Sequence, residues 1–158
     1  MPERIDYLDD PAAPKANSLV PSANVIVVND KGEILMIRRT DNDNWAVPGG
    51  GMDLGESMTD AAVRETQEET GIRCEITGLV GIYTNPRHVI RYTSNNEVRQ
   101  EFSIVFTARP VGGDLQPSSE SSEPQWVSPT AVPSLQMHPS MRQRIQHYLN
   151  NRRDPYLG

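Results

Sequence analysis

Three glutamates in one short stretch of the chain have the spacing of a metal site. They lie in the segment Arg64-Glu65-Thr66-Gln67-Glu68-Glu69, at relative positions i, i+3 and i+4. In a helix this spacing places the three carboxylates within one arc of about 100°, where they repel one another. Such a face is either a solvated acidic surface or a site for a hard divalent cation. Mg²⁺ takes oxygen ligands and completes its coordination with water and phosphate oxygens.

The residues on either side of this segment favour the metal site. From Gly50 to Ile72 the chain reads Gly-Xaa5-Glu-Xaa7-Arg-Glu-Thr-Xaa-Glu-Glu-Xaa-Gly-Ile. This pattern of 23 residues resembles the signature of the Nudix hydrolase superfamily at eight of its nine specified positions. The exception is Thr66, which stands where the signature has an aliphatic residue and which would lie on the packing side of the helix. The preceding residues, from Trp45 to Gly50, also resemble the family's usual lead-in.

The resemblance implies a set of metal ligands. Glu65, Glu68 and Glu69 would bind Mg²⁺, for which Mn²⁺ can substitute, together with the backbone carbonyl of Gly49. Glycine at this point lets the backbone approach an ion closely.

Two further charged residues of the motif would support this site. Arg64 would pair with Glu56 or Glu68 and hold a carboxylate in place. Glu56 either contacts a metal directly or is a supporting charge near the helix N-terminus, where the helix dipole favours an anion.

The resemblance also implies a reaction, the hydrolysis of a nucleoside diphosphate linked to another group. Water would attack a phosphorus atom, with Arg64 and the three helix glutamates as catalytic residues and metal ions neutralising the phosphate oxygens. Some members add a loop carboxylate as the base, six residues before a tryptophan. Here that residue is Glu120, six before Trp126. Glu123 and Glu101 are alternatives, and a solvated loop charge is the competing interpretation of Glu120.

Substrate choice depends on residues outside the signature. Pro86 stands 15 residues beyond Gly71, as in the ADP-ribose subgroup, although an ordinary turn is the alternative. The substrate-binding candidates are two arginines, an aromatic residue, an acidic residue and this proline: Arg39, Arg87, Tyr83, Glu101 and Pro86. Rings that could stack on a base are Tyr83, Tyr92, Phe102 and Phe106. We expect ADP-ribose or a nucleoside triphosphate as the substrate, and the histidines and the single cysteine show no zinc spacing.

The expected order of elements places the motif in a mixed α/β fold. Apolar runs predict strands at residues 24–29, 34–37, 76–82, 87–92, 101–108 and 125–127, with a hairpin turn at 30–32. Helices are expected at 59–70, capped by Thr59 and ended by Gly71, and at 139–149. A long polar loop, 112–124, precedes the last strand. Together with the resemblance, these elements predict a Nudix-type α/β/α sandwich with a mixed β-sheet between helices.

Length and composition predict one domain with polar ends. The 158 residues suffice for one core, which we expect at 18–150, between a polar arm at 1–17 and a polar tail at 151–158. The net charge of −6 argues against binding to long nucleic acid. No apolar run is long enough to cross a membrane, and the first residues lack the apolar stretch of a secretion signal. We therefore expect a cytoplasmic protein, and a homodimer is a further expectation from the family.

Two functions remain open on the sequence. The first is a metal-dependent pyrophosphohydrolase with a small nucleotide as its substrate. The second is a catalytically weak Nudix-fold module that senses or binds a nucleotide. Such a module would be expected to have lost a carboxylate, and the presence of Glu65, Glu68 and Glu69 therefore favours the enzyme.

Overall fold

A mixed five-stranded sheet forms the centre of the molecule. In this computed structural model, residues 4–158 are described. In chain order the elements are β1 (Arg4–Leu8), β2 (Ser18–Leu19), β3 (Ser22–Val27), β4 (Ile34–Arg38), β5 (Trp45–Ala46), β6 (Gly49–Gly51), α1 (Met58–Thr70), β7 (Ile72–Tyr83), β8 (His88–Tyr92), β9 (Val98–Gln100), β10 (Ser103–Gly113), β11 (Gln125–Val127), the 3₁₀ turn η1 (Val132–Ser134), α2 (Pro139–Leu149) and β12 (Tyr156–Leu157). The central sheet has the order β12-β7-β10-β3-β6. Because β10 pairs antiparallel with β7 and parallel with β3, the sheet is mixed.

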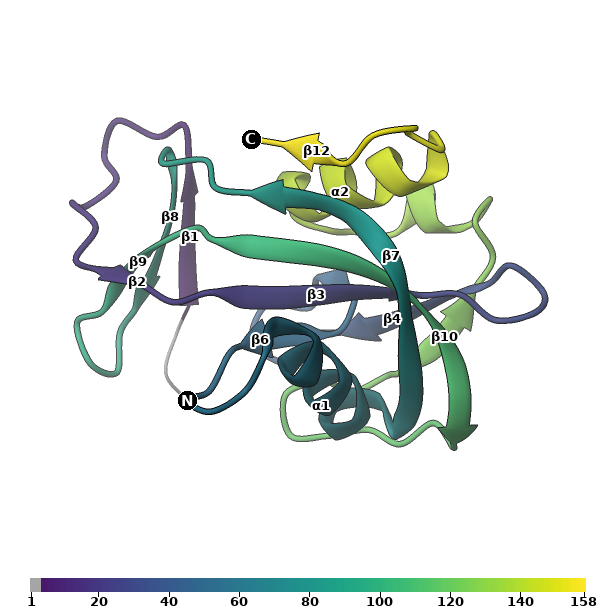
Figure 1. Cartoon of the computed structure of the whole chain (residues 1–158). Helices are drawn as coiled ribbons and strands as arrows, with labels where there is room; N and C mark the ends of the chain where they lie inside the picture. The colour runs from purple at the N-terminus through teal and green to yellow at the C-terminus, as the bar shows by residue number, and fades with distance from the viewer. Residues whose placement is uncertain (1–3) are drawn as a thin grey trace.

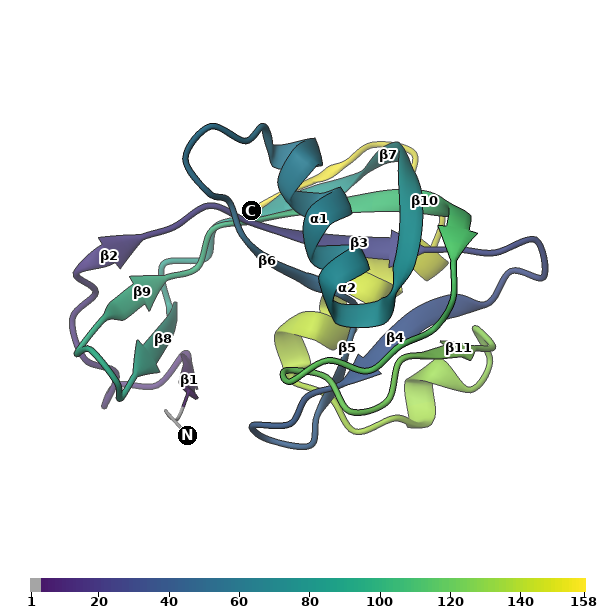
Figure 2. The same cartoon turned by 90° about the horizontal axis from the view of Figure 1, so that it is seen from below.

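Helices α1 and α2 cover opposite faces of the central sheet (Figure 1, Figure 2). Successive side chains of a strand point to opposite faces, and β3 shows the consequence. Val25 belongs to the same buried cluster as Ala62 of α1, whereas Ile26 belongs to the cluster that contains Ile145 of α2. A second sheet, β11-β4-β5, completes the core. The predicted α/β/α sandwich is therefore confirmed.

Helix α1 begins at Met58, one residue earlier than the sequence predicts, and its cap lies two residues earlier. Its N-cap is Ser57 and not Thr59. The Ser57 hydroxyl accepts a hydrogen bond from the Asp60 N–H at 3.1 Å, and the Asp60 carboxylate accepts one from the Ser57 N–H at 3.0 Å. This reciprocal pair is a capping box, which satisfies two amide groups that a helix start leaves open. At the other end Gly71 has φ +82°, a left-handed conformation that ends the helix as predicted.

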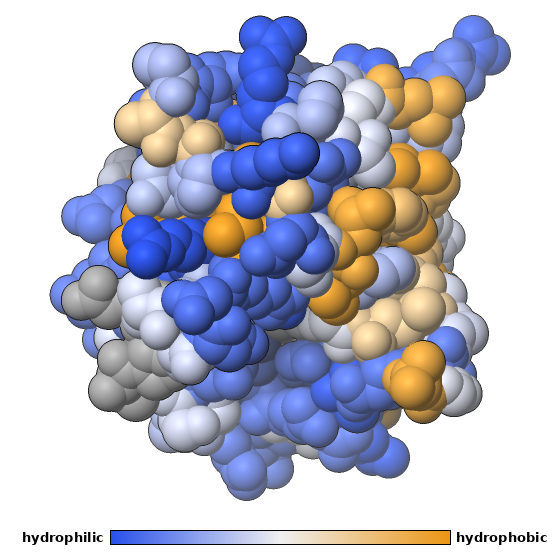
Figure 3. Space-filling view, turned by 90° about the vertical axis from the view of Figure 1, so that its left-hand side faces the viewer, coloured by the Kyte–Doolittle hydropathy of each residue, from blue (hydrophilic) through white to orange (hydrophobic). Residues whose placement is uncertain are grey.

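A small accessory sheet, with the order β1-β8-β9-β2, stands beside the central one. Its first strand lies inside the predicted polar arm: residues 4–8 pair antiparallel with β8, and residues 1–3 lie outside the described part of the chain. The arm therefore contains a strand that the composition did not indicate. Figure 3 views the molecule from this side, and the surface there is largely hydrophilic, with apolar side chains gathered along one edge.

The predicted polar tail also contributes to the fold. β12 pairs parallel with β7 at the edge of the central sheet. The ring of Tyr156 stacks on that of Tyr83, with 4.9 Å between centroids, and lies 4.4 Å from that of His147. The end of the chain is therefore packed against β7 and α2.

The other strands that the sequence predicts are present but most of them differ in their limits, whereas the short strands β2, β5, β6 and β9 were not predicted. The strands expected at 76–82 and 101–108 extend over 72–83 and 103–113, so the polar loop begins at residue 114. The strand at 125–127 and the helix at 139–149 have the predicted limits. Within residues 4–158, no helix is both long enough and apolar enough to cross a bilayer.

Candidate active site

The three glutamates of α1 differ in how far they are buried. Glu69 is 6% exposed, the side chain of Glu65 is 14% exposed, and that of Glu68 is 59% exposed. Strand β6 packs against this face, where the Gly49 N–H donates to a Glu69 carboxylate oxygen at 3.2 Å. A Cβ atom at Gly50 would lie 2.4 Å from the carboxyl carbon of Glu65, so only glycine leaves room for that carboxylate.

Arg64 connects the acidic residues of the motif to one another. It donates to both carboxylate oxygens of Glu56, at 2.7 and 2.9 Å, and also to Glu65 at 2.9 Å and Glu68 at 3.2 Å. A further bond reaches the Gly51 carbonyl at 3.1 Å. Since both oxygens of Glu56 bind Arg64, this arrangement fits the supporting role, one of the two that the sequence left open for Glu56. Planar guanidinium groups suit such two-point contacts.

Thr66 shows how a hydroxyl is accommodated at the aliphatic position of the signature. Thr66 is fully buried, on the packed side of α1. Its hydroxyl donates to the Ala62 carbonyl at 2.8 Å. The polar group is thus satisfied within the helix, and its methyl group remains available for packing.

The acidic cluster resists full ionisation. Burial raises the pKa of Glu69 to about 8, the charges of Glu65 and Glu120 add to this effect, and the Gly49 N–H opposes it. Burial also raises the pKa of Glu65, against the opposing effect of Arg64. A cation placed among these carboxylates would favour their charged forms. The donors are hard oxygens, which fit Mg²⁺ or Mn²⁺.

The loop before β11 brings Glu120 to this cluster. Buried Ser121 donates from its hydroxyl to the Glu69 carbonyl at 2.6 Å, and the Thr40 N–H donates to the Glu120 carbonyl at 3.1 Å. Glu120 lines the same cavity as Glu69. The competing candidate Glu123 instead forms an ion pair with Arg38 at 3.2 Å.

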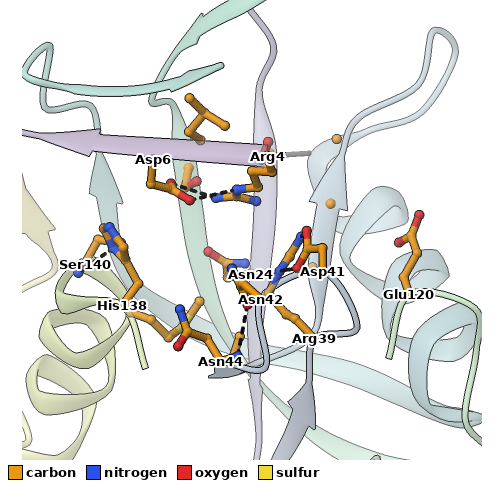
Figure 4. Close-up of a pocket in the computed structure, with 18 of the residues that line it drawn as sticks. Arg4, Asp6, Asn24, Arg39, Asp41, Asn42, Asn44, Glu120, His138 and Ser140 are labelled. Carbon is orange, nitrogen blue, oxygen red and sulfur yellow. Dashed lines mark hydrogen bonds and ion pairs between the residues drawn. The ribbon is translucent and has the colours of Figure 1, made fainter. Parts of the chain in front are cut away.

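A cavity of about 530 Å³ begins at this cluster and continues away from α1. Figure 4 shows Glu120 beside α1 at one end and the pair His138 and Ser140 at the other. Arg39 and Asp41 lie between these ends, joined by an ion pair of 2.6 Å. Cavities of this size are typical of small-molecule sites.

The substrate-binding candidates from the sequence divide into two groups. Arg39 and Glu101 line the cavity, whereas Arg87, Tyr83 and Pro86 do not. Tyr83 is buried, and its hydroxyl bonds to Nδ1 of His147 at 2.8 Å. Arg87 is exposed and lies 3.7 Å from Asp9, and Pro86 is in the exposed turn between β7 and β8.

The rings considered for base stacking divide in the same way. Tyr92 and Phe102 line the cavity. Phe106 is buried in the core beneath α1, as its place in a strand would suggest. Trp45, which had not been considered for stacking, is a third aromatic residue in the lining.

Several residues at the far end of the cavity were not recognised in the sequence as site residues: Arg4, Asp6, Asn24, His138 and Arg144. Asp6, His88 and His138 each offer a ligand atom, and these atoms lie within 4.8 Å of one another. Spacing along the chain could not reveal this group because its members come from β1, β8 and the start of α2. The alternation of polar and apolar residues at 4–8 was the one feature of the sequence that could have predicted a strand there.

Comparison with known proteins agrees with the geometry. The NUDIX domain family model matches residues 18–148. The chain is similar to a "MutT-like protein" of Streptomyces ambofaciens, with 38% identity over 68% of this chain and 62% of that protein. It is also similar to a "Putative 8-oxo-dGTP diphosphatase" of Bacillus subtilis, with 33% identity over 84% of this chain and 81% of that protein. An "ADP-ribose pyrophosphatase" of Methanocaldococcus jannaschii is 31% identical over 69% of this chain and 62% of that protein.

Solved structures share the fold. A NUDIX hydrolase from Nitrosomonas europaea superposes with a TM-score of 0.68 at 21% identity, over 87% of this chain and 93% of that chain. A MutT protein from Methanosarcina mazei gives a TM-score of 0.66 at 25% identity, over 87% of this chain and 98% of that chain. The family match over most of the chain, the named relatives and the shared fold together show that this chain belongs to the Nudix hydrolase superfamily, with pyrophosphohydrolases among its relatives.

Proposed function

We propose that this chain is a Mg²⁺-dependent pyrophosphohydrolase of a small nucleotide, with Mn²⁺ able to replace Mg²⁺. The observation that carries the proposal is the acidic cluster at one end of the cavity, where burial, together with the neighbouring charges of Glu65 and Glu120, raises the pKa of Glu69 to about 8. A divalent cation would relieve this repulsion. Glu65, Glu68 and Glu69 would hold it, together with the Gly49 carbonyl.

The chain's own groups would share the remaining tasks. A divalent cation at such a site supplies neutralisation of the phosphate oxygens and activation of the attacking water. Glu120, at the mouth of the cluster, would accept the proton of that water. Arg39 would meet a phosphate oxygen, because it lines the cavity next to the cluster. The bond from phosphorus to the bridging oxygen breaks, which yields a nucleoside monophosphate and the remaining phosphorylated group.

We infer that the substrate is a purine nucleoside triphosphate, and the panel below includes one in oxidised form. The relative named for 8-oxo-dGTP aligns over 81% of its length, whereas the one named for ADP-ribose aligns over 62%. The proline that suggested the ADP-ribose subgroup, Pro86, lies in an exposed turn outside the cavity lining. The expected cytoplasmic location and the homodimer stay predictions.

A panel of nucleotides tests the proposal. Release of nucleoside monophosphate should be measured from dGTP, 8-oxo-dGTP, ATP and ADP-ribose, each with Mg²⁺, Mn²⁺ or EDTA. We expect turnover with either metal and the highest kcat/KM for a purine triphosphate. Turnover that persists in EDTA would refute the metal assignment, and no turnover on any substrate would favour the sensing module.

Two matched variants locate the activity. Glu69→Gln should lose most of the turnover while keeping the fold. Glu75→Gln removes the same charge from an exposed residue that pairs with Arg109 at 3.0 Å and does not line the cavity. It should retain the rate of the wild type.

A further inference from the structure

A continuous series of charged side chains runs along the cavity away from α1. Arg4 contacts Asp6 at 3.1 Å, and Asp6 accepts from Nε2 of His88 at 3.0 Å. Nδ1 of His88 lies 3.5 Å from Glu101, which pairs with Arg144 at 3.1 Å. All five residues line the cavity. They come from β1, β8, the segment before β10, and α2.

This series lies at the opposite end of the cavity from the acidic cluster. In Figure 4, Arg4 and Asp6 on β1 and His138 at the start of α2 surround one region, and Glu120 lies apart from them beside α1. A nucleotide whose phosphates bind at α1 would therefore reach this region with its other part. This step rests on the function proposed above.

The charges of this far end are already balanced. Each of three lining arginines has a carboxylate partner: Arg4 with Asp6, Arg144 with Glu101, and Arg99 with Glu97 at 2.9 Å. Arg39 is also paired, with Asp41, but it lies next to the proposed metal site. A second phosphate group at the far end would have to compete with the carboxylates there without a divalent cation beside it. An uncharged group with hydrogen-bonding edges fits this surface better.

The far end also offers apolar contacts and hydrogen-bond donors. Ile90, Phe102 and Met141 line it. Nε of Arg144 is buried and has no hydrogen-bond partner among the described residues. Nδ1 of His138 accepts the Ser140 N–H at 3.2 Å, which places the proton of the neutral ring on Nε2 as a donor. Apolar surface with a few placed donors is the composition of a site for a nucleobase and its sugar.

A metal ion is a weaker explanation of the group formed by Asp6, His88 and His138. The two imidazole rings are stacked, with 5.2 Å between centroids and 13° between planes, so their nitrogens do not converge on one point. Arg4 also engages both carboxylate oxygens of Asp6. The geometry therefore suits a polar wall more than a coordination shell.

We propose that strand β1 supplies one wall of a nucleoside-binding site, and that Asp6, held by Arg4 and His88, is a specificity-determining residue of that wall. The substrate class that this site selects is a mononucleotide with an uncharged base at the far end. A substrate with phosphate groups at both ends is disfavoured.

Equilibrium binding in EDTA tests this proposal separately from catalysis. The probes are adenosine, guanosine, cytidine and uridine, titrated calorimetrically into the full chain without metal, so that no phosphate meets the acidic cluster. We expect at least one purine nucleoside to bind the wild type, and Asp6→Asn to weaken its binding by about tenfold or more. Asp9→Asn is the matched control: Asp9 is exposed, does not line the cavity and has φ +51°, which asparagine tolerates. It should bind within about twofold of the wild type.

Several outcomes would overturn the proposal. These are unchanged binding in Asp6→Asn, no binding of any probe to the wild type, or a Zn²⁺ titration that saturates in the wild type and is lost in Asp6→Asn. If Asp6→Asn fails to fold, Arg4→Gln replaces it, because the Arg4 side chain is 25% exposed and lies at the start of its strand. A wild type that binds a probe but hydrolyses no nucleotide would count against the proposed enzyme and leave this site supported.

Discussion

Removing the charge of Glu69 should stabilise the metal-free protein, and increasingly so as the pH rises. Glu69 is 6% exposed, and its pKa is raised from 4.5 to about 8, mainly by burial. Between these two values the unfolded chain has released a proton that the folded protein still holds. The free energy of unfolding therefore falls as the pH rises through this window.

The size of this effect follows from the pKa difference. The wild type should lose up to about 1.4 kcal/mol of stability per pH unit from this one group. Between pH 5 and 7 the loss is roughly 2–3 kcal/mol, equivalent to roughly 5–10 °C in Tm for a domain of this size. Glu69→Gln removes the titration and keeps an oxygen that accepts the Gly49 N–H.

Urea unfolding in EDTA at pH 5, 6, 7 and 8 measures the effect. The stability difference between Glu69→Gln and the wild type should grow with pH. Glu68→Gln is the matched control, because it removes the same charge from a side chain that is 59% exposed. Its stability should stay within a few tenths of a kcal/mol of the wild type, without a trend. Parallel pH profiles for the wild type and Glu69→Gln would refute the reasoning.

Four further predictions concern the same end of the cavity. Millimolar Mg²⁺ should raise the Tm of the wild type by linkage, by several °C at roughly 100 times Kd, and Zn²⁺ should be a poor substitute; calorimetry in each metal checks this. Glu120→Gln should lower kcat by roughly 10²–10⁴ with little change in KM, whereas Glu123→Gln should be nearly silent; a reversed result would reassign the base. Gly50→Ala should keep the fold, judged by circular dichroism, but displace Glu65 and reduce Mg²⁺ binding. Ser121→Ala should lower kcat through Glu120, so it should have no added effect in a Glu120→Gln background.

The acidic helix could be predicted from the sequence because its information is local. The spacing from Gly50 to Ile72 sets the helix, its glutamates and its final glycine, and all of these occur where expected. The start at Ser57 was missed, since the capping box depends on a pair of side chains and not on one residue. The position of Glu120 beside α1 agrees with its spacing from Trp126, while its role as the base stays a prediction.

The far end of the cavity and the packing of the end of the chain could not be predicted in this way. β1 and β12 are short strands that form only by pairing with β8 and β7, and neither has an apolar run of its own. Tyr83 has an aromatic ring that could stack on a nucleobase, yet in the fold this ring packs against Tyr156 and His147. Strand pairing and ring packing of this kind depend on which segments, distant in the sequence, come into contact in the fold. A single sequence carries little information about such contacts.

The two ends of the cavity also differ in how the chain must fold to build them. The glutamates of α1 lie within five consecutive residues, so one helix brings them together as soon as it forms. The far end joins Asp6 to His88 across 82 residues and Asn24 to Arg144 across 120. Contacts between residues that are so far apart in the sequence form late in folding. Where a short edge strand makes such contacts, they are also the first to break. Detachment of β1 alone would therefore remove the proposed nucleoside wall and leave the proposed metal ligands in place, and hydrogen exchange should be faster at β1 than at α1.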